Sequence, residues 1–211
     1  MESKLIEASL VNISKELDEV EERREKVLRE SRDVISFSAK AITDIHLAKF
    51  DEARSKLDSA NALLRELRKA GKDDLYRYLI APEMEYVEAS ALYSIAMSRP
   101  IPSYRELGVK NVSYLLGLLD TIGEIKRRIY DEIRRGKSSE AYSLFSIMER
   151  LYTLLLPFGV YDHLAQGIRR KLDVARVLIE NTRSAVTEEA RRSEMIRSME
   201  NLSKKLSKKK K

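Results

Sequence analysis

Apolar and small side chains recur every three or four positions over most of the first 49 residues. This spacing places them on one face of an α-helix, so residues 4–49 are predicted to form one long amphipathic helix. The stripe consists of Leu10, Ile13, Leu17, Val20, Val27, Val34, Ser38, Ala41, Ile45 and Ala48. Arg24 and Ser31 interrupt it. These polar positions indicate that part of the helix faces an interface or a wet cavity, although slips in an exposed heptad pattern would look the same.

Glycine and proline divide the rest of the chain into further helices. Gly71 is a normal helix terminator, and Pro82 predicts a kink or break near Ile80. Residues 99–103, Arg-Pro-Ile-Pro-Ser, cannot be helical and form the clearest loop. The predicted helices cover residues 51–70, 72–97, 104–107, 112–135, 138–156 and 161–206. The sequence therefore predicts an all-α fold, a bundle of six to seven antiparallel helices joined by short loops.

Composition agrees with long amphipathic helices, because 35% of the 211 residues are charged and only 7 are Gly and 4 are Pro. This length suits one domain, predicted over residues 1–202, followed by a basic, disordered tail at 203–211 that carries six lysines. The chain has no Cys, which excludes disulfides, thiolate zinc sites and a Cys nucleophile. Neither a secretory segment nor an apolar stretch of membrane length is apparent, so we expect a cytoplasmic protein without a membrane partner.

The net charge of +6 and the pI near 9.3 favour polyanionic partners. At residues 76–78, Tyr-Arg-Tyr, aromatic and basic side chains alternate. There Arg77 could contact a phosphate while a ring stacks on a base. Local packing explains these tyrosines equally well.

Two pairs of acidic residues lie where an apolar helix would not favour them. Asp120 and Glu124 are four residues apart in a strongly apolar stretch, and Glu85 and Glu88 are three apart among apolar or small residues. Both spacings place the two carboxylates of a pair on one helix face. A buried carboxylate costs several kcal/mol unless it is protonated, paired with a cation or bound to metal.

If the two faces meet, four carboxylates converge and a divalent cation would relieve their repulsion. Because all four candidate ligands are carboxylates and offer only oxygen atoms, Mg²⁺ or Mn²⁺ suits the site better than zinc. Two simpler interpretations stay open. Acidic pairs arise often by chance in a chain with 34 acidic residues, mostly on solvated faces, and Asp120 could pair with an Arg of a neighbouring helix.

Three blocks of the chain resemble the translin family and, within it, the catalytic branch trax. Residues 31–40, Ser-Arg-Asp-Val-Ile-Ser-Phe-Ser-Ala-Lys, with the later His46, are similar to a trax block S-R-D-I-T-x-E-S-K-R. Residues 85–89 are similar to the trax motif E-Y-V-E-A, and residues 114–124 to Y-L-L-G-x-x-D-L-T-G-E. The resemblance covers roughly residues 20–185 in order. The tail after about Arg191 has no counterpart, and the first block has Ser and Ala where trax is more polar.

The resemblance implies a seven-helix fold that assembles into a closed, hollow octamer with inward-facing active sites. Glu85, Glu88, Asp120 and Glu124 match the four acidic positions of trax's metal-dependent ribonuclease site. These residues are therefore the candidate metal ligands and catalytic residues, with Mg²⁺ or Mn²⁺ as the cofactor. Translin itself lacks the acids of the second block, so this chain sides with the nuclease.

The resemblance also suggests how RNA is held. Arg77 lies eight residues before Glu85, where the family has an arginine implicated in nucleic-acid contact. Arg32 and Lys40 are further candidates to bind the RNA backbone. The expected protein is a metal-dependent endoribonuclease for single-stranded RNA, with single-stranded DNA as a further candidate partner, in a homo-octamer or another closed homo-oligomer.

Two other functions remain open from the sequence. A non-catalytic single-stranded RNA- or DNA-binding scaffold, as translin is, would retain oligonucleotide without cutting it. A purely structural helical subunit would explain the periodicity but would give Asp120 and Glu124 no role.

Overall fold

The computed structural model describes residues 2–71 and 74–209, and every regular element among these residues is a helix. The all-α prediction is confirmed. The α-helices are α1 Glu2–His46, α2 Phe50–Gly71, α3 Ile80–Ala96, α4 Tyr104–Leu107, α5 Asn111–Arg134, α6 Ser138–Leu155 and α7 Ile168–Lys209. Two 3₁₀-helices, Tyr76–Tyr78 and Leu156–Tyr161, precede α3 and follow α6.

The chain divides into two compact units, residues 1–117 and 118–211, and the boundary lies within α5 after Gly117. That residues 1–202 form one domain stays a prediction.

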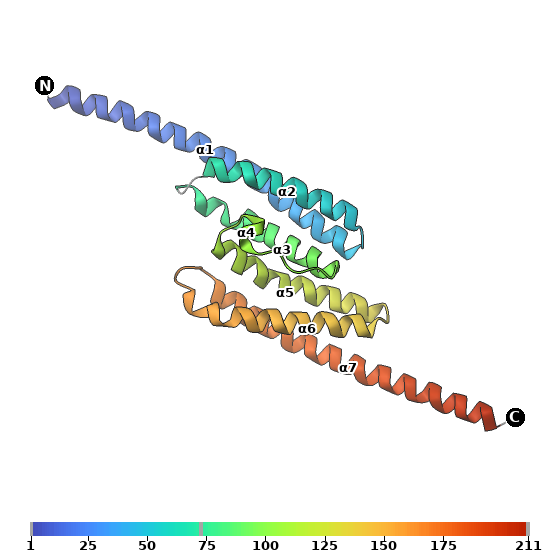
Figure 1. The fold of residues 1–211 in the computed structure, drawn as a ribbon. Coiled ribbons are helices and arrows are strands. Elements are labelled where there is room, and N and C mark those ends of the chain that lie inside the picture. Colours follow the sequence, from blue (N-terminus) through green and yellow to red (C-terminus); the bar gives the residue numbers. More distant parts are fainter. Residues whose placement is uncertain (1, 72–73, 210–211) are drawn as a thin grey trace. The chain divides into compact units, whose positions relative to one another are not determined.

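In the first unit, α1 packs along both α2 and α3. Figure 1 shows α2 returning beside the second half of α1, while the first half of α1 continues past the end of α2. α2 contributes buried residues that step by four and three, namely Ala53, Leu57, Ala60, Leu64 and Leu67. This is the spacing of a coiled-coil seam. The predicted seam forms in the second half of α1, where Val27, Val34, Ala41 and Ile45 are buried.

The chain breaks before α3, as the sequence predicted. A turn and the 3₁₀-helix Tyr76–Tyr78 lead into α3, which begins at Ile80. Pro82 lies in the first turn of α3, where an N–H has no partner within the helix, so the proline is tolerated there. Residues 72–73, which the sequence assigned to the third helix, lie outside the described residues.

In the second unit, α6 packs against α7. α7 begins at Ile168, so the predicted start at residue 161 is wrong. The 3₁₀-helix Leu156–Tyr161 and a turn at Gly167, whose φ is +90°, occupy the intervening residues. Asp162 accepts a hydrogen bond of 3.0 Å from the N–H of Arg169 and so satisfies one of the unpaired donors of the first turn.

The end of α7 also differs from the prediction. The sequence predicted a disordered tail from residue 203, whereas α7 continues as a helix through Lys209. Leu206 continues the helical spacing of Met199 and Leu202, and lysines near a helix C-terminus interact favourably with the helix dipole. The basic composition alone had suggested disorder. Residues 210–211 lie outside the described part of the chain.

Within the described residues, one stretch is long and apolar enough to cross a membrane by length and composition, namely Ser138–Tyr161. The expectation that the chain has no such stretch was therefore wrong. The criterion is weak support for a membrane span, because core helices of soluble proteins also meet it. Glu149 in the middle of α6 forms an ion pair of 2.7 Å with Arg183 of α7, which is a contact between packed helices.

Candidate functional site

Glu85 and Glu88 lie on α3, one turn apart, and both are half-buried. The helix that carries them is otherwise packed into the core of the first unit, and Val87, Ala89 and Leu92 are fully buried. Their carboxylates are therefore held on a rigid helix at the edge of a dry core. Such a position favours a fixed direction for the side chains over free movement in solvent.

Glu83, two residues before Glu85, is the most buried acid of the described chain, with 1% of its surface exposed. Its carboxylate accepts hydrogen bonds from Arg68 Nε at 3.0 Å, from the Tyr76 hydroxyl at 2.9 Å and from the Lys110 N–H at 3.3 Å. Ser113 Oγ lies 2.9 Å from the same tyrosine hydroxyl. Burial raises the pKa of Tyr76 above its usual range. Glu83 is thus fully satisfied by its neighbours, and its role is structural.

Gly117 marks a close approach of α5 to α3 within the first unit. A Cβ at this position would lie 2.5 Å from the carbonyl oxygen of Met84 and 2.7 Å from Cβ of Val87. Real Cβ atoms do not approach other heavy atoms so closely, so only glycine permits this contact. Met84 immediately precedes Glu85, and Val87 immediately precedes Glu88. The close approach therefore occurs at the turn of α3 that carries both candidate ligands.

Asp120 and Glu124 lie on the part of α5 that belongs to the second unit, and about a quarter of each side chain is exposed, 25% and 24%. Asp120 forms a close ion pair with Nζ of Lys171, in the first turn of α7. Glu124 lies 3.8 Å from Arg127, one turn further along α5. The sequence had left open that Asp120 pairs with an arginine of a neighbouring helix. It does pair with a neighbouring helix, but the partner is a lysine.

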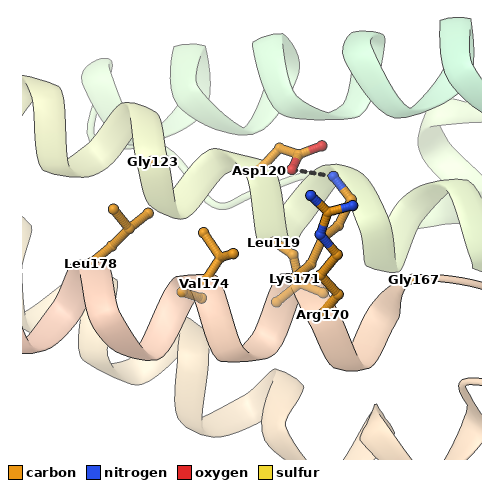
Figure 2. Close-up of a pocket in the computed structure, with 9 residues that line it drawn as sticks. Leu119, Asp120, Gly123, Gly167, Arg170, Lys171, Val174 and Leu178 are labelled. Atoms are coloured by element: carbon orange, nitrogen blue, oxygen red, sulfur yellow. Dashed lines mark hydrogen bonds and ion pairs between the residues drawn. The ribbon is translucent and has the colours of Figure 1, made fainter.

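A cavity of about 390 Å³ lies beside Asp120 in the second unit. Figure 2 shows Arg170 and Lys171 rising from α7 toward Asp120, with Leu119 and Val174 beside them. Two cations and one carboxylate give the lining a net positive charge. The cavity can therefore accept an anionic group such as a phosphate, which a guanidinium binds through paired hydrogen bonds.

Arg77 is exposed in the first unit and stacks on Tyr78, with its guanidinium carbon 4.8 Å from the ring centre. Its Nη2 donates a hydrogen bond of 2.8 Å to the hydroxyl of Tyr78. Arg24 of α1 donates a second one, at 3.2 Å, to the same oxygen. Hydrogen bonds from Arg24 and then Arg77 lower the pKa of Tyr78. Two arginines thus flank one half-buried ring, an arrangement that can bind a phosphate and stack a base.

The other two predicted RNA contacts lie elsewhere on α1. Arg32 and Lys40 are exposed, and the Nζ of Lys40 lies 5.9 Å from the ring centre of Phe37. With Arg24 on the seam of α1, the heptad pattern places Arg32 and Lys40 on its outer side. The structure therefore joins Arg77 to Arg24 and Tyr78, while Arg32 and Lys40 form separate exposed cations.

Known proteins similar to this chain identify its family. No family model matches it. It is 35% identical over 162 residues to the uncharacterized protein MJ0175 of Methanocaldococcus jannaschii, over 75% of this chain and 72% of that one. A crystal structure of AfC3PO is 30% identical, covers 86% of this chain and 97% of that chain, and superposes with a TM-score of 0.80. The chain belongs to the translin family.

Two further structures agree with this assignment to the translin family. A complex of AfC3PO with duplex RNA superposes with a TM-score of 0.79 at 29% identity, over 86% of this chain and 96% of that chain. Apo-NeC3PO superposes with a TM-score of 0.76 at 27% identity, over 85% and 96%. The fold of the translin type, expected from the three sequence blocks, is confirmed.

A divalent metal in a translin-family protein of the trax type would need several oxygen ligands. Glu85, Glu88, Asp120 and Glu124 offer carboxylate oxygens on two helices, all half-buried, so the chemistry of the donors fits Mg²⁺ or Mn²⁺. Among residues 2–71 and 74–209, no group of three or more His, Asp or Glu side chains is gathered as a metal site. The two pairs belong to different units, and their convergence stays a prediction.

Sequence reasoning missed three residues of the site. Glu83 shares its short helix with Glu85 and Glu88, and no sequence signal distinguishes the satisfied acid from the other two. Lys171 lies 51 residues after Asp120, beyond the reach of any local pattern. Arg24 was visible only as an interruption of the apolar stripe, and no local pattern indicated its hydrogen bond to Tyr78.

Proposed function

We propose that this translin-family protein is a trax-like endoribonuclease that depends on Mg²⁺ or Mn²⁺ and binds RNA inside a closed homo-oligomer. One observation carries the proposal, namely the close approach of α5 to α3 at Gly117. It fixes α5 against the turn that holds Glu85 and Glu88. Asp120 follows three residues later on the same helix, and we assign all four acids to one metal site because they match the four acidic positions of trax.

Each of these residues has a definite role in the proposal. Glu85, Glu88, Asp120 and Glu124 provide the oxygen ligands, and the bound ion would lower the pKa of a water and neutralise charge on the phosphate. Lys171 balances Asp120 when no ion is bound. Cleavage of this kind leaves a 5′-phosphate and a 3′-hydroxyl.

RNA binding is supported by the neighbour and by the chemistry of the first unit. The AfC3PO complex contains duplex RNA, so duplex and single-stranded probes both belong in the assay. Arg77 and Arg24 around Tyr78 are suited to one nucleotide, and Arg32 and Lys40 to the backbone. Contacts with phosphates release counterions, so binding should weaken as salt rises.

The test replaces Glu124 by Gln, which keeps the shape of the side chain and removes its charge. The matched control is Glu140→Gln, which changes an exposed glutamate of the same unit. We expect Glu124→Gln to lower cleavage of a short RNA with Mn²⁺ by about 100-fold or more, because even residues behind metal ligands cost roughly 10- to 100-fold. Calorimetric titration with Mn²⁺ should show the same loss of binding. Undiminished cutting and Mn²⁺ binding by Glu124→Gln would refute the assignment.

A non-catalytic RNA-binding scaffold is the second candidate, and the ion pair between Asp120 and Lys171 favours it. A carboxylate that already has a cation needs no metal. On this alternative the wild-type protein retains the RNA probe but neither binds Mn²⁺ nor cuts. The wild-type titration alone therefore separates the two functions.

A further inference from the structure

Both long helices extend beyond the packed part of their own unit. In α1, residues 4–22 form an N-terminal arm, all exposed except for the half-buried Val20. In α7, residues 191–207 form a C-terminal arm, all exposed except for the half-buried Ser193. Figure 1 shows α1 continuing past α2 and α7 continuing past α6. Most helical stability in proteins comes from packing of an amphipathic face, and neither arm has such packing within its own unit.

Each arm carries an apolar stripe with heptad spacing. The N-terminal stripe is Ile6, Leu10, Ile13, Leu17 and Val20, whose first four members are between 49% and 63% exposed. The C-terminal stripe is Met195, Met199, Leu202 and Leu206, between 56% and 58% exposed. Alternating steps of four and three residues are the pattern by which one helix packs against another in a coiled coil. Exposed apolar stripes of this kind mark interaction surfaces.

The two arms carry opposite charge. The N-terminal arm has six acidic and two basic residues, a net charge of −4. The C-terminal arm has five basic and two acidic residues, a net charge of +3. Glu7 and Glu16 flank the first stripe, and Arg191 and Lys205 flank the second, at the positions that set partner choice in coiled coils. Pairing of like arms would bring like charges together, whereas pairing of unlike arms is favourable.

We propose that the N-terminal arm of one copy pairs with the C-terminal arm of a second copy as a two-stranded coiled coil. Reciprocal pairing would use all four arms of two chains and would bury both apolar stripes in each. This inference rests on the self-association in the proposed function and is independent of its nuclease activity.

Other possible partners of the two arms explain fewer of these observations. An RNA backbone offers charge to the C-terminal arm but no apolar surface for its four stripe residues. An anionic membrane could receive the C-terminal arm but would repel the acidic N-terminal arm. A second copy accounts for the stripe and the charge of both arms with one contact.

The test reverses charges beside the stripes in the full-length protein. One variant carries Glu7→Lys and Glu16→Lys, a second carries Arg191→Glu and Lys205→Glu, and a third carries all four changes. The matched control, Asp18→Lys with Glu22→Lys, makes the same charge change as the first variant on the outer side of the arm. Mass is measured by light scattering over a range of protein concentrations, and circular dichroism confirms that each variant is folded.

We expect each single-arm reversal to raise the dissociation constant of the assembly about tenfold or more, a change of about 1.4 kcal/mol. The four-change variant should return to nearly the wild-type value, and the outer-face control should stay there. Replacing Leu10 and Leu17 by Gln, which leaves the charge unchanged, should weaken assembly as well. RNA cleavage is measured separately, so loss of assembly and loss of the nuclease can be told apart.

Three results would overturn the proposal. If the mass is the same for all variants, the arms pair within one chain or do not pair. If the single-arm reversals weaken assembly but the four-change variant does not recover, the arms do not recognise each other. If the Arg191 and Lys205 changes weaken binding to RNA or to anionic vesicles without changing the mass, the C-terminal arm serves that partner instead.

Discussion

Replacing Gly117 by alanine tests the close approach of α5 to α3. In the interior of a helix, Gly→Ala normally stabilises by about 1 kcal/mol. At this position the added Cβ would lie 2.5 Å from the carbonyl oxygen of Met84 and 2.7 Å from Cβ of Val87. A backbone carbonyl cannot rotate away, so a whole helix must shift, and overpacking costs about 1–3 kcal/mol. With the cost at the upper end of that range, Gly117→Ala should destabilise by about 2 kcal/mol.

Gly123 is the matched control, because it lies in the interior of the same helix with more room. A Cβ there would meet only Cδ1 of Leu178, at 3.9 Å, which is an ordinary contact. Thermal unfolding by circular dichroism, at one protein concentration, should show Gly117→Ala about 4–8 °C below wild type and Gly123→Ala about 2–4 °C above it. If the unfolding temperatures of both variants change in the same direction, α5 does not approach α3 closely at Gly117. The proposed metal site then loses its main structural support.

Three further predictions concern the site. Tyr76→Phe should reduce the loss of stability at high pH. Burial raises the pKa of Tyr76, so the unfolded chain releases this proton first and the stability of the wild type falls as pH rises above about 10. Urea unfolding at two pH values would measure this loss. An equal loss in wild type and variant would contradict this. Lys171→Met should leave Mn²⁺ affinity unchanged or raise it, because the competing cation of Asp120 is gone; weaker binding in a calorimetric titration would show that the lysine supports the metal site. In a filter-binding assay, Arg77→Gln should weaken RNA retention and reduce the number of counterions released on binding by about one. Arg105 is another exposed arginine stacked on a tyrosine, and Arg105→Gln should change neither quantity.

The apolar periodicity predicted the helices well, because a stripe with steps of three and four residues is a direct consequence of burial on one face. Pro82 also predicted the break before α3, because a proline restricts the backbone of the residues next to it in the sequence. The start of α7 was placed seven residues too early, since the residues between 161 and 168 have helical composition but form turns that end at Gly167. The end of α7 was misjudged because lysine content was weighed above the continuing apolar stripe.

The candidate site was harder to predict, because its partners come from distant parts of the sequence. Spacing alone selected Asp120 and Glu124 and found their helix face. It could not supply Lys171, whose position depends on how α7 packs against α5. Nor could it show that Glu83 is held by Arg68 and two other donors, since that network joins α2, α3 and the residues before α5.

The ion pair between Asp120 and Lys171 has a consequence for the folding of the second unit. In zinc fingers the metal itself drives folding, and a chain without metal stays unfolded. Here a lysine of the chain already compensates the carboxylate, so the second unit can fold without any dissolved cation. On the proposed function, an ion that binds after folding would have to displace this amine from Asp120.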